Sequence, residues 1–86
     1  IQLCKKYSVL TIADEVMTGF GRTGPIFACE SLTNKPDILC LSKAITGGFL
    51  PLGATLCRQK IYDAFLSASL EKALLHGHSY SGNPLA

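Results

Sequence analysis

Three apolar runs, separated by polar and glycine-rich stretches, dominate the pattern of this chain. Residues 8–13 and 38–41 are nearly continuous runs of apolar and β-branched side chains, and residues 52–57 form a similar run. Unbroken runs of this length are typical of strands that are covered on both faces of a sheet. We therefore predict a strand at each of these three places.

The segments between the apolar runs predict loops and short helices. Residues 18–24 contain three glycines and must form a loop. Pro25 is placed to open a short helical piece over residues 26–32, because a proline in the first helical turn loses no hydrogen bond. Residues 59–66 also predict a short helix. The order strand, crossover, strand predicts an α/β fold built on an open sheet.

Length and composition limit the class of protein. The chain has 86 residues, of which 48% are hydrophobic, and this is too apolar for a disordered segment. The longest stretches without charge, residues 44–57 and 73–86, are interrupted by glycines and a proline, so no membrane span is predicted. The net charge of +2 is scattered, which argues against a nucleic-acid surface. Because the sequence begins at Ile1 and the sheet needs more strands, we expect an internal piece that cannot complete its own core.

The cysteines and histidines do not predict a metal site. The residues in question are Cys4, Cys29, Cys40, Cys57, His76 and His78. They form no C-x-x-C pair, and both histidines lie far from every cysteine in sequence. With no signal-peptide pattern in view, we expect a cytoplasmic protein with reduced thiols.

Two charged residues follow the first two predicted strands, Asp14 after the first and Lys43 after the second. Ligands of open parallel sheets bind just beyond the carboxyl ends of the strands. An acid and an amine at one edge suit pyridoxal phosphate, since a lysine can form a Schiff base and an acid can keep the ring nitrogen protonated. The alternative is structural, with Asp14 forming a turn and Lys43 solvated at a strand end.

Three motifs resemble the class III aminotransferases, which are pyridoxal-phosphate-dependent enzymes of fold type I. They are ADEVMTGFGRTG at residues 13–24, LSKAITGG at residues 41–48 and HGHSYSGNP at residues 76–84. The resemblance extends over residues 8–86. It implies that residues 1–86 are a central fragment of the large cofactor-binding domain, in which helices flank a mostly parallel sheet. It also implies a homodimer.

The resemblance assigns the residues that would hold the cofactor ring. Lys43 would be the Schiff-base lysine and the base that moves a proton between the substrate Cα and the cofactor C4′. Asp14 would pair with the pyridine nitrogen as a carboxylate. Val16 would press on one face of the ring, and the alternative is an ordinary core valine.

The resemblance also assigns a phosphate site. Ser79 stands where the family usually has Thr, and it would bind the cofactor phosphate across the dimer. The backbone N–H groups of Gly77 and His78 would assist, because glycine-bearing turns expose such donors to anions. His76 would serve at the surface or at a dimer contact, and Tyr80 would pack.

Arg22 and Glu15 belong to the glycine-rich motif. By resemblance, Arg22 is a candidate for binding the substrate carboxylate, since a guanidinium binds a carboxylate through two hydrogen bonds. The alternative is a structural ion pair between Arg22 and Glu15. Glu15 itself is expected to be structural, holding the loop of residues 18–24, here called the glycine loop, by hydrogen bonds.

Within the family, the resemblance is greatest to the branch that acts in biotin biosynthesis, through residues 27–30, 36–40, 49–52 and 76–84. It implies S-adenosylmethionine as the amino donor and 8-amino-7-oxononanoate as the acceptor. One alternative is another class III aminotransferase that acts on ornithine, 4-aminobutyrate or a different ω-amino acid. Another is a catalytically inert fragment, and we expect the 86-residue chain alone to be inactive.

Overall fold

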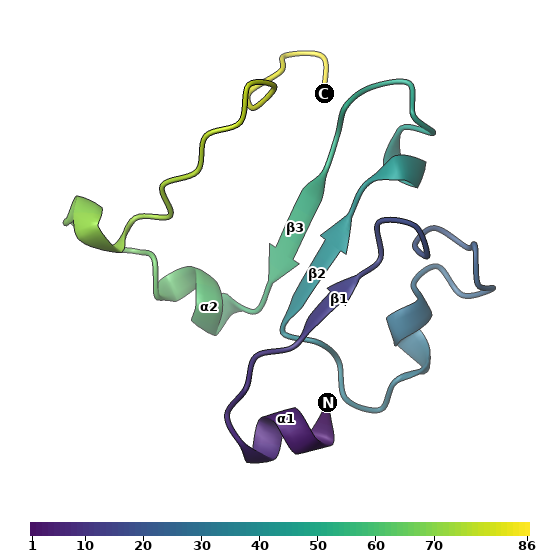
Figure 1. Cartoon of the computed structure of the whole chain (residues 1–86), viewed down its shortest axis with the longest axis horizontal. Helices are drawn as coiled ribbons and strands as arrows, with labels where there is room; N and C mark the ends of the chain where they lie inside the picture. The colour runs from purple at the N-terminus through teal and green to yellow at the C-terminus, as the bar shows by residue number, and fades with distance from the viewer.

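The computed structural model describes all 86 residues and contains one three-stranded sheet. The strands are β1 (Ile12–Asp14), β2 (Ile38–Leu41) and β3 (Ala54–Cys57), in the spatial order β1–β2–β3. β2 coincides with its predicted range, and β3 lies within its predicted range. Figure 1 shows the three strands side by side, with β2 in the middle.

The sheet is mixed. β1 pairs with β2 in parallel, with Asp14 opposite Cys40. β3 pairs with β2 in the antiparallel sense, with Leu41 opposite Ala54. The predicted α/β character is therefore present, but only one of the two strand pairings in this chain is parallel. The crossover from β1 to β2 contains a single short 3₁₀ helix in place of a regular α-helix.

The helices are short. They are α1 (Gln2–Lys6), α2 (Gln59–Asp63) and the 3₁₀ helices η1 (Ala28–Ser31), η2 (Lys43–Ile45) and η3 (Leu70–Lys72). α1 precedes β1 and α2 follows β3 (Figure 1). Beyond η3, residues 73–86 contain no helix or strand, and Figure 1 shows this C-terminal segment running back past β3.

The core is minimal. Only three of 86 residues are buried, among them Leu41 at the end of β2 and Glu15 directly after β1. The chain measures 43 × 40 × 15 Å, so it is a plate little thicker than one sheet with its side chains. Ile12 in β1 is 65% exposed. The strands are thus not covered on both faces within this chain, and the expectation that it cannot complete its own core is confirmed.

The first strand is much shorter than its predicted range of residues 8–13. The N–H of Val9 donates to the carbonyl of Cys4 at 2.8 Å, and Ser8 adopts a φ of +55°. These residues form the turn that ends α1, a helix absent from the sequence prediction. Pairing with β2 begins only where Ile12 lies opposite Ile38.

The helical piece expected to open at Pro25 begins later, at Ala28 in η1. The carbonyl of Ile26 accepts hydrogen bonds from the N–H groups of Phe20 and Gly21, at 2.6 and 3.2 Å. Because of these bonds, the backbone around Ile26 pairs with the glycine loop and does not form a helix. α2 likewise stops at Asp63, short of the predicted residue 66.

Glu15 connects the glycine loop to the sheet and is 3% exposed. Its carboxylate accepts hydrogen bonds from the N–H groups of Cys29 at 2.7 Å and Ala28 at 3.1 Å, and from the Thr18 hydroxyl. Its carbonyl accepts from the N–H of Gly19 at 2.9 Å. A Cβ at Gly19 would lie 2.9 Å from that carbonyl oxygen, so only glycine fits there.

These contacts confirm the structural role predicted for Glu15. The predicted alternative of an ion pair between Glu15 and Arg22 is wrong, because the one salt bridge in the structure joins Arg58 to Asp37. The carboxylate of Glu15 is already satisfied by uncharged donors, and burial leaves no space for a guanidinium beside it.

Asp37 holds the opposite end of the sheet. One carboxylate oxygen accepts from the N–H of Thr11 at 2.9 Å and from its hydroxyl at 2.8 Å. The other lies 3.1 Å from Nε of Arg58. Thr11 precedes β1, Asp37 precedes β2 and Arg58 follows β3. A single side chain therefore fixes the alignment of all three strands.

Both carboxyl groups ionise more easily in this fold than in an unfolded chain. The Thr18 hydroxyl is the main cause that lowers the pKa of Glu15, and it acts against burial, which raises that pKa. The backbone N–H of Thr11 is the main cause that lowers the pKa of Asp37. A lowered pKa in the fold means that ionisation stabilises it.

We predict that the glycine loop loosens only in acid. The contribution of Glu15 is complete above its ordinary pKa of 4.5 and is lost as the pH falls through the lower pKa of the folded state. The amide NMR signals of Ala28 and Cys29 should therefore titrate with a midpoint below 4.5. In a Glu15→Gln variant this titration should be absent. A midpoint at or above 4.5 would contradict the role given to these hydrogen bonds.

Candidate active site

Asp14 and Lys43 lie at the same edge of the sheet. Asp14 is the last residue of β1, and Lys43 follows the last residue of β2 by two positions. The strands are parallel neighbours with Asp14 opposite Cys40, and such strands are about 4.8 Å apart. Both side chains are exposed. The condition for a shared site, adjacent parallel strands, is therefore met.

Asp14 is oriented by its own backbone. Its Oδ1 accepts a hydrogen bond from the N–H of Val16 at 3.0 Å, and no hydrogen bond occupies Oδ2. A carboxylate held in this way keeps one oxygen free to accept a proton donor. Val16 is half-buried, and it stands two residues after Asp14.

Lys43 begins η2 with a φ of +26°, in the left-handed region that residues with a Cβ rarely adopt. Its ammonium group makes no hydrogen bond and no ion pair in the structure. The amine is therefore available to a ligand, and the backbone that carries it is unusual.

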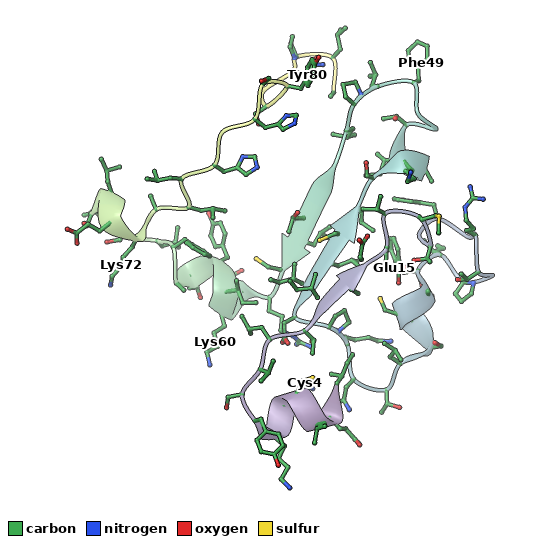
Figure 2. The ribbon with its side chains drawn as sticks, in the orientation of Figure 1. Cys4, Glu15, Phe49, Lys60, Lys72 and Tyr80 are labelled. Atoms are coloured by element: carbon green, nitrogen blue, oxygen red, sulfur yellow. The ribbon has the colours of Figure 1, made fainter.

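A hollow of about 810 Å³ lies beside the end of β2. Its lining includes Val16, Cys40, Leu41 and Ser42 on the sheet side, residues 51–55 at the start of β3, and His76, His78 and Tyr80 from the C-terminal segment. Figure 2 labels Tyr80 in that segment, on the opposite side of β3 from Glu15. The volume is within the range of small-molecule sites. Of the predicted cofactor residues, Val16 and His78 line this hollow.

The C-terminal segment presents Ser79 at the tip of a turn. The N–H of Tyr80 donates to Nδ1 of His78 at 3.1 Å, and the N–H of Ser81 donates to the carbonyl of His78 at 2.9 Å. Gly77, like Ser79, is exposed. No hydrogen bond connects Ser79 to Asp14 or Lys43. Gly77 and Ser79 are absent from the lining of the 810 Å³ hollow, and the sequence prediction places the phosphate site between two subunits.

Arg22 is exposed in the glycine loop and makes no hydrogen bond or ion pair. It is absent from the lining of the 810 Å³ hollow. The structure thus leaves its guanidinium free and does not bring it to the other predicted residues. No group of three or more His, Cys, Asp or Glu side chains in the structure is arranged to hold a metal ion. None of its helices has the length and apolar character that crossing a membrane requires.

The sequence prediction overlooked two hydroxyls beside the amine. Ser42 Oγ donates to the carbonyl of Leu52 at 2.7 Å, and Thr46 Oγ1 donates to the carbonyl of Leu50 at 2.8 Å. Both residues flank Lys43 in the sequence, close to a glycine pair. Serine and threonine in turns commonly form hydrogen bonds to nearby backbone groups, and this tendency could have predicted both bonds from the sequence.

The residues present suit a planar aromatic cofactor that carries an aldehyde. A free amine and a carboxylate with one free oxygen follow two adjacent parallel strands at one edge of the sheet. The apolar side chain of Val16 lines the hollow beside that edge, whereas Asp14 and Lys43 lie outside its lining. These are the three partners that pyridoxal phosphate needs for its aldehyde, its ring nitrogen and its ring face.

Comparison with known proteins identifies the family of the chain. The family description "Aminotransferase class-III" matches residues 1–86. The adenosylmethionine-8-amino-7-oxononanoate aminotransferase of Staphylococcus aureus is 60% identical over 85 residues, covering 98% of this chain and 19% of that protein. The chain therefore spans about a fifth of the length of such relatives.

Solved structures agree in fold. The adenosylmethionine-8-amino-7-oxononanoate aminotransferase of Methanocaldococcus jannaschii superposes with a TM-score of 0.80 at 52% identity, over 92% of this chain and 19% of that one. An amine transaminase from an uncultivated Pseudomonas species, in its PLP-bound (internal aldimine) form, superposes with a TM-score of 0.84 at 46% identity, over 96% and 19%. The chain belongs to the class III aminotransferases.

Proposed function

We propose that the chain forms a central part of the large domain of a pyridoxal-phosphate-dependent aminotransferase of fold type I. Three observations support this. The chain spans about a fifth of its relatives, and only three of its residues are buried. The outer edges of β1 and β3 have no partner strand, so further strands can extend the sheet. The longer protein that contains this chain is called the complete enzyme below.

The observation that carries the proposal is the placement of Asp14 and Lys43 on adjacent parallel strands. Pyridoxal phosphate, when bound, supplies an aldehyde that bonds to amines and a ring that takes up electrons. Nζ of Lys43 would hold the cofactor and would move the proton between the substrate Cα and the cofactor C4′. The carboxylate of Asp14 would keep the ring nitrogen protonated, and Val16 would cover one face of the ring.

The remaining predicted residues complete the site in a homodimer. The Ser79 hydroxyl and the N–H groups of Gly77 and His78 bind the phosphate of the cofactor in the other subunit. Their exposure on a turn supports this, since the turn offers them to a second chain. The free guanidinium of Arg22 binds the carboxylate of a substrate.

For the substrates, we propose S-adenosylmethionine as amino donor and 8-amino-7-oxononanoate as acceptor, giving 7,8-diaminononanoate in biotin biosynthesis. Relatives whose names contain both compounds are 52 to 60% identical to this chain over 85 aligned residues. A second candidate is an ω-amino acid donor such as ornithine or 4-aminobutyrate. An ornithine delta-aminotransferase of Plasmodium falciparum superposes with a TM-score of 0.78, but its identity is lower, at 43%.

Replacement of Lys43 tests the cofactor attachment. In the complete enzyme, borohydride reduction should fix the cofactor on the peptide that contains Lys43, and Lys43→Ala should abolish this label because no other lysine follows β2 at this edge. Lys72→Ala, in exposed η3, should leave it unchanged. Peptide mapping by mass spectrometry measures both. A label on any other lysine would refute the proposal.

Replacement of Asp14 tests the electrostatic role. Asp14→Asn keeps the size of the side chain but removes the charge that holds the ring nitrogen protonated. The variant should still bind the cofactor, and kcat should fall by about a hundredfold or more, since the proton removed from Cα leaves a charge that the ring must accept. Stopped-flow kinetics measure the loss. A rate near that of the unaltered enzyme would remove Asp14 from the chemistry.

A comparison of amino donors tests the substrates. The complete enzyme should transfer the amino group of S-adenosylmethionine to 8-amino-7-oxononanoate with a kcat/KM well above that for ornithine or 4-aminobutyrate. The isolated 86-residue chain should show no turnover with any donor, because it lacks most of the phosphate and substrate contacts. Absence of turnover with S-adenosylmethionine would favour the second candidate.

A further inference from the structure

The connection between β2 and β3, residues 42–53, carries Lys43 and is called the Lys43 loop here. Backbone pairing of the two strands ends where Leu41 lies opposite Ala54. Beyond that pair, no backbone hydrogen bond crosses from residues 42–46 to residues 50–53. The two sides of the loop are therefore joined by something other than the strand ladder.

Two hydroxyl hydrogen bonds join them. Ser42 Oγ donates to the carbonyl of Leu52 at 2.7 Å, directly next to the last strand pair. Thr46 Oγ1 donates to the carbonyl of Leu50 at 2.8 Å and accepts a longer bond, of 3.4 Å, from the N–H of the same residue. Lys43 lies between Ser42 and Thr46. The segment that carries the amine is thus fixed at both ends by side chains.

Packing does not hold the tip of the loop, although Ile45, Leu50 and Leu52 at its sides are half-buried. Phe49 at its tip is 89% exposed, and Figure 2 shows it pointing away from the sheet. Within the loop, the N–H of Ile45 donates to the carbonyl of Ser42 at 3.0 Å, and that of Phe49 donates to Thr46 at 3.2 Å. These bonds close two turns that both start at a hydroxyl residue. Turn formation and hydroxyl bonding therefore depend on the same two positions.

Lys43 is in an unfavourable backbone conformation between these positions. Its φ of +26° brings the Cβ against the backbone, and a residue with a Cβ stays there only when its surroundings hold it. The torsion φ also determines where the Cα–Cβ bond points. A change to negative φ would therefore redirect the whole side chain of Lys43.

We propose that Ser42 and Thr46 are positioning residues for the amine of Lys43. Their hydroxyl bonds to Leu52 and Leu50 hold Lys43 at positive φ, and this directs Nζ to the edge where Asp14 stands. The inference rests on the proposed role of Lys43 in holding pyridoxal phosphate. Both hydroxyls donate to carbonyls of the loop, so they act on the chemistry through Lys43 and are not catalytic residues.

The first test removes each hydroxyl from the complete enzyme. Thr46→Val and Ser42→Ala should lower kcat about tenfold to a hundredfold, with KM within about twofold, since a misplaced amine slows the chemistry more than it weakens substrate binding. Thr46→Ser keeps the hydroxyl and should restore the rate. Thr33→Val is a matched control, because the Thr33 hydroxyl is exposed and has no hydrogen bond. It should behave as the unaltered enzyme.

A readout without turnover accompanies these kinetics. When pyridoxal phosphate is added to the cofactor-free enzyme, the rate at which Lys43 bonds to it should fall about tenfold in Thr46→Val and recover in Thr46→Ser. The amide of Ile45 should exchange its hydrogen faster in Thr46→Val than in Thr33→Val. Unchanged bonding rates and unchanged exchange in Thr46→Val and Ser42→Ala would overturn the inference.

The second test measures the backbone conformation itself in the cofactor-free enzyme. At a positive φ glycine is preferred to alanine, so Lys43→Gly should unfold at a higher urea concentration than Lys43→Ala. In the Thr46→Val background the difference should shrink or reverse, because the loop can relax. Equal or reversed midpoints in the unaltered background would show that Lys43 is not held at positive φ and would overturn the inference.

The two proposals fail in different ways. If borohydride labels a lysine other than Lys43 in the unaltered enzyme, the proposed function fails, and the inference fails with it. If the label is on Lys43 but the hydroxyl variants bond the cofactor at the normal rate, only the inference fails. The glycine–alanine comparison needs no cofactor and reports on the loop in either case.

Discussion

The parallel pairing of β1 with β2 is the constraint on which the rest of the structure depends. Its register places Asp14 opposite Cys40, and Lys43 follows Cys40 by three residues, just beyond the end of β2. Side chains alternate along a strand, so a slip of one residue would turn Asp14 to the other side of the sheet and bring Glu15 to the site. The acid and the amine would then no longer share one edge. Asp37 prevents that slip at the other end, since it bonds to Thr11 before β1.

Two consecutive carboxylates at the end of β1 have opposite tasks, and the structure shows why. Glu15 is buried and accepts hydrogen bonds from Cys29, Ala28 and Thr18, so it has no oxygen to offer to a ligand. Asp14 is exposed, and only one of its carboxylate oxygens accepts a hydrogen bond, from the N–H of Val16. The residue that is saturated by the protein stabilises the loop, and the residue that is left unsaturated is available for chemistry. Residue type alone does not separate the two.

Local pattern predicted the parts of the fold that depend on local interactions. The run over residues 38–41 is bounded by Asp37 and Ser42, and it is a strand over that range. The start of β1 was misplaced because the turn at Ser8 belongs to a preceding helix. The helix expected at Pro25 fails because Ile26 bonds back to Phe20, a contact between two sides of a loop. The antiparallel sense of β3 and the bridge from Asp37 to Arg58 likewise join distant segments, which periodicity does not report.

The candidate site was predictable where its residues directly follow the ends of strands. It was less predictable where it depends on contacts across a loop or on protein that covers the strands. Asp14 and Lys43 could be proposed from the sequence because ligands bind at strand ends, whereas the hydroxyl bonds of Ser42 and Thr46 depend on carbonyls across a loop. The strength of a charge interaction at Asp14 also depends on whether the strands around it are covered. A unit charge pair at 4 Å is worth about 1 kcal/mol in water and about 4 kcal/mol at an effective dielectric constant of 20. Asp14 is exposed, and so is Ile12 beside it in β1. In the proposed complete enzyme, protein that covered these strands would also lower the dielectric constant around Asp14 and strengthen its proposed interaction with the cofactor ring.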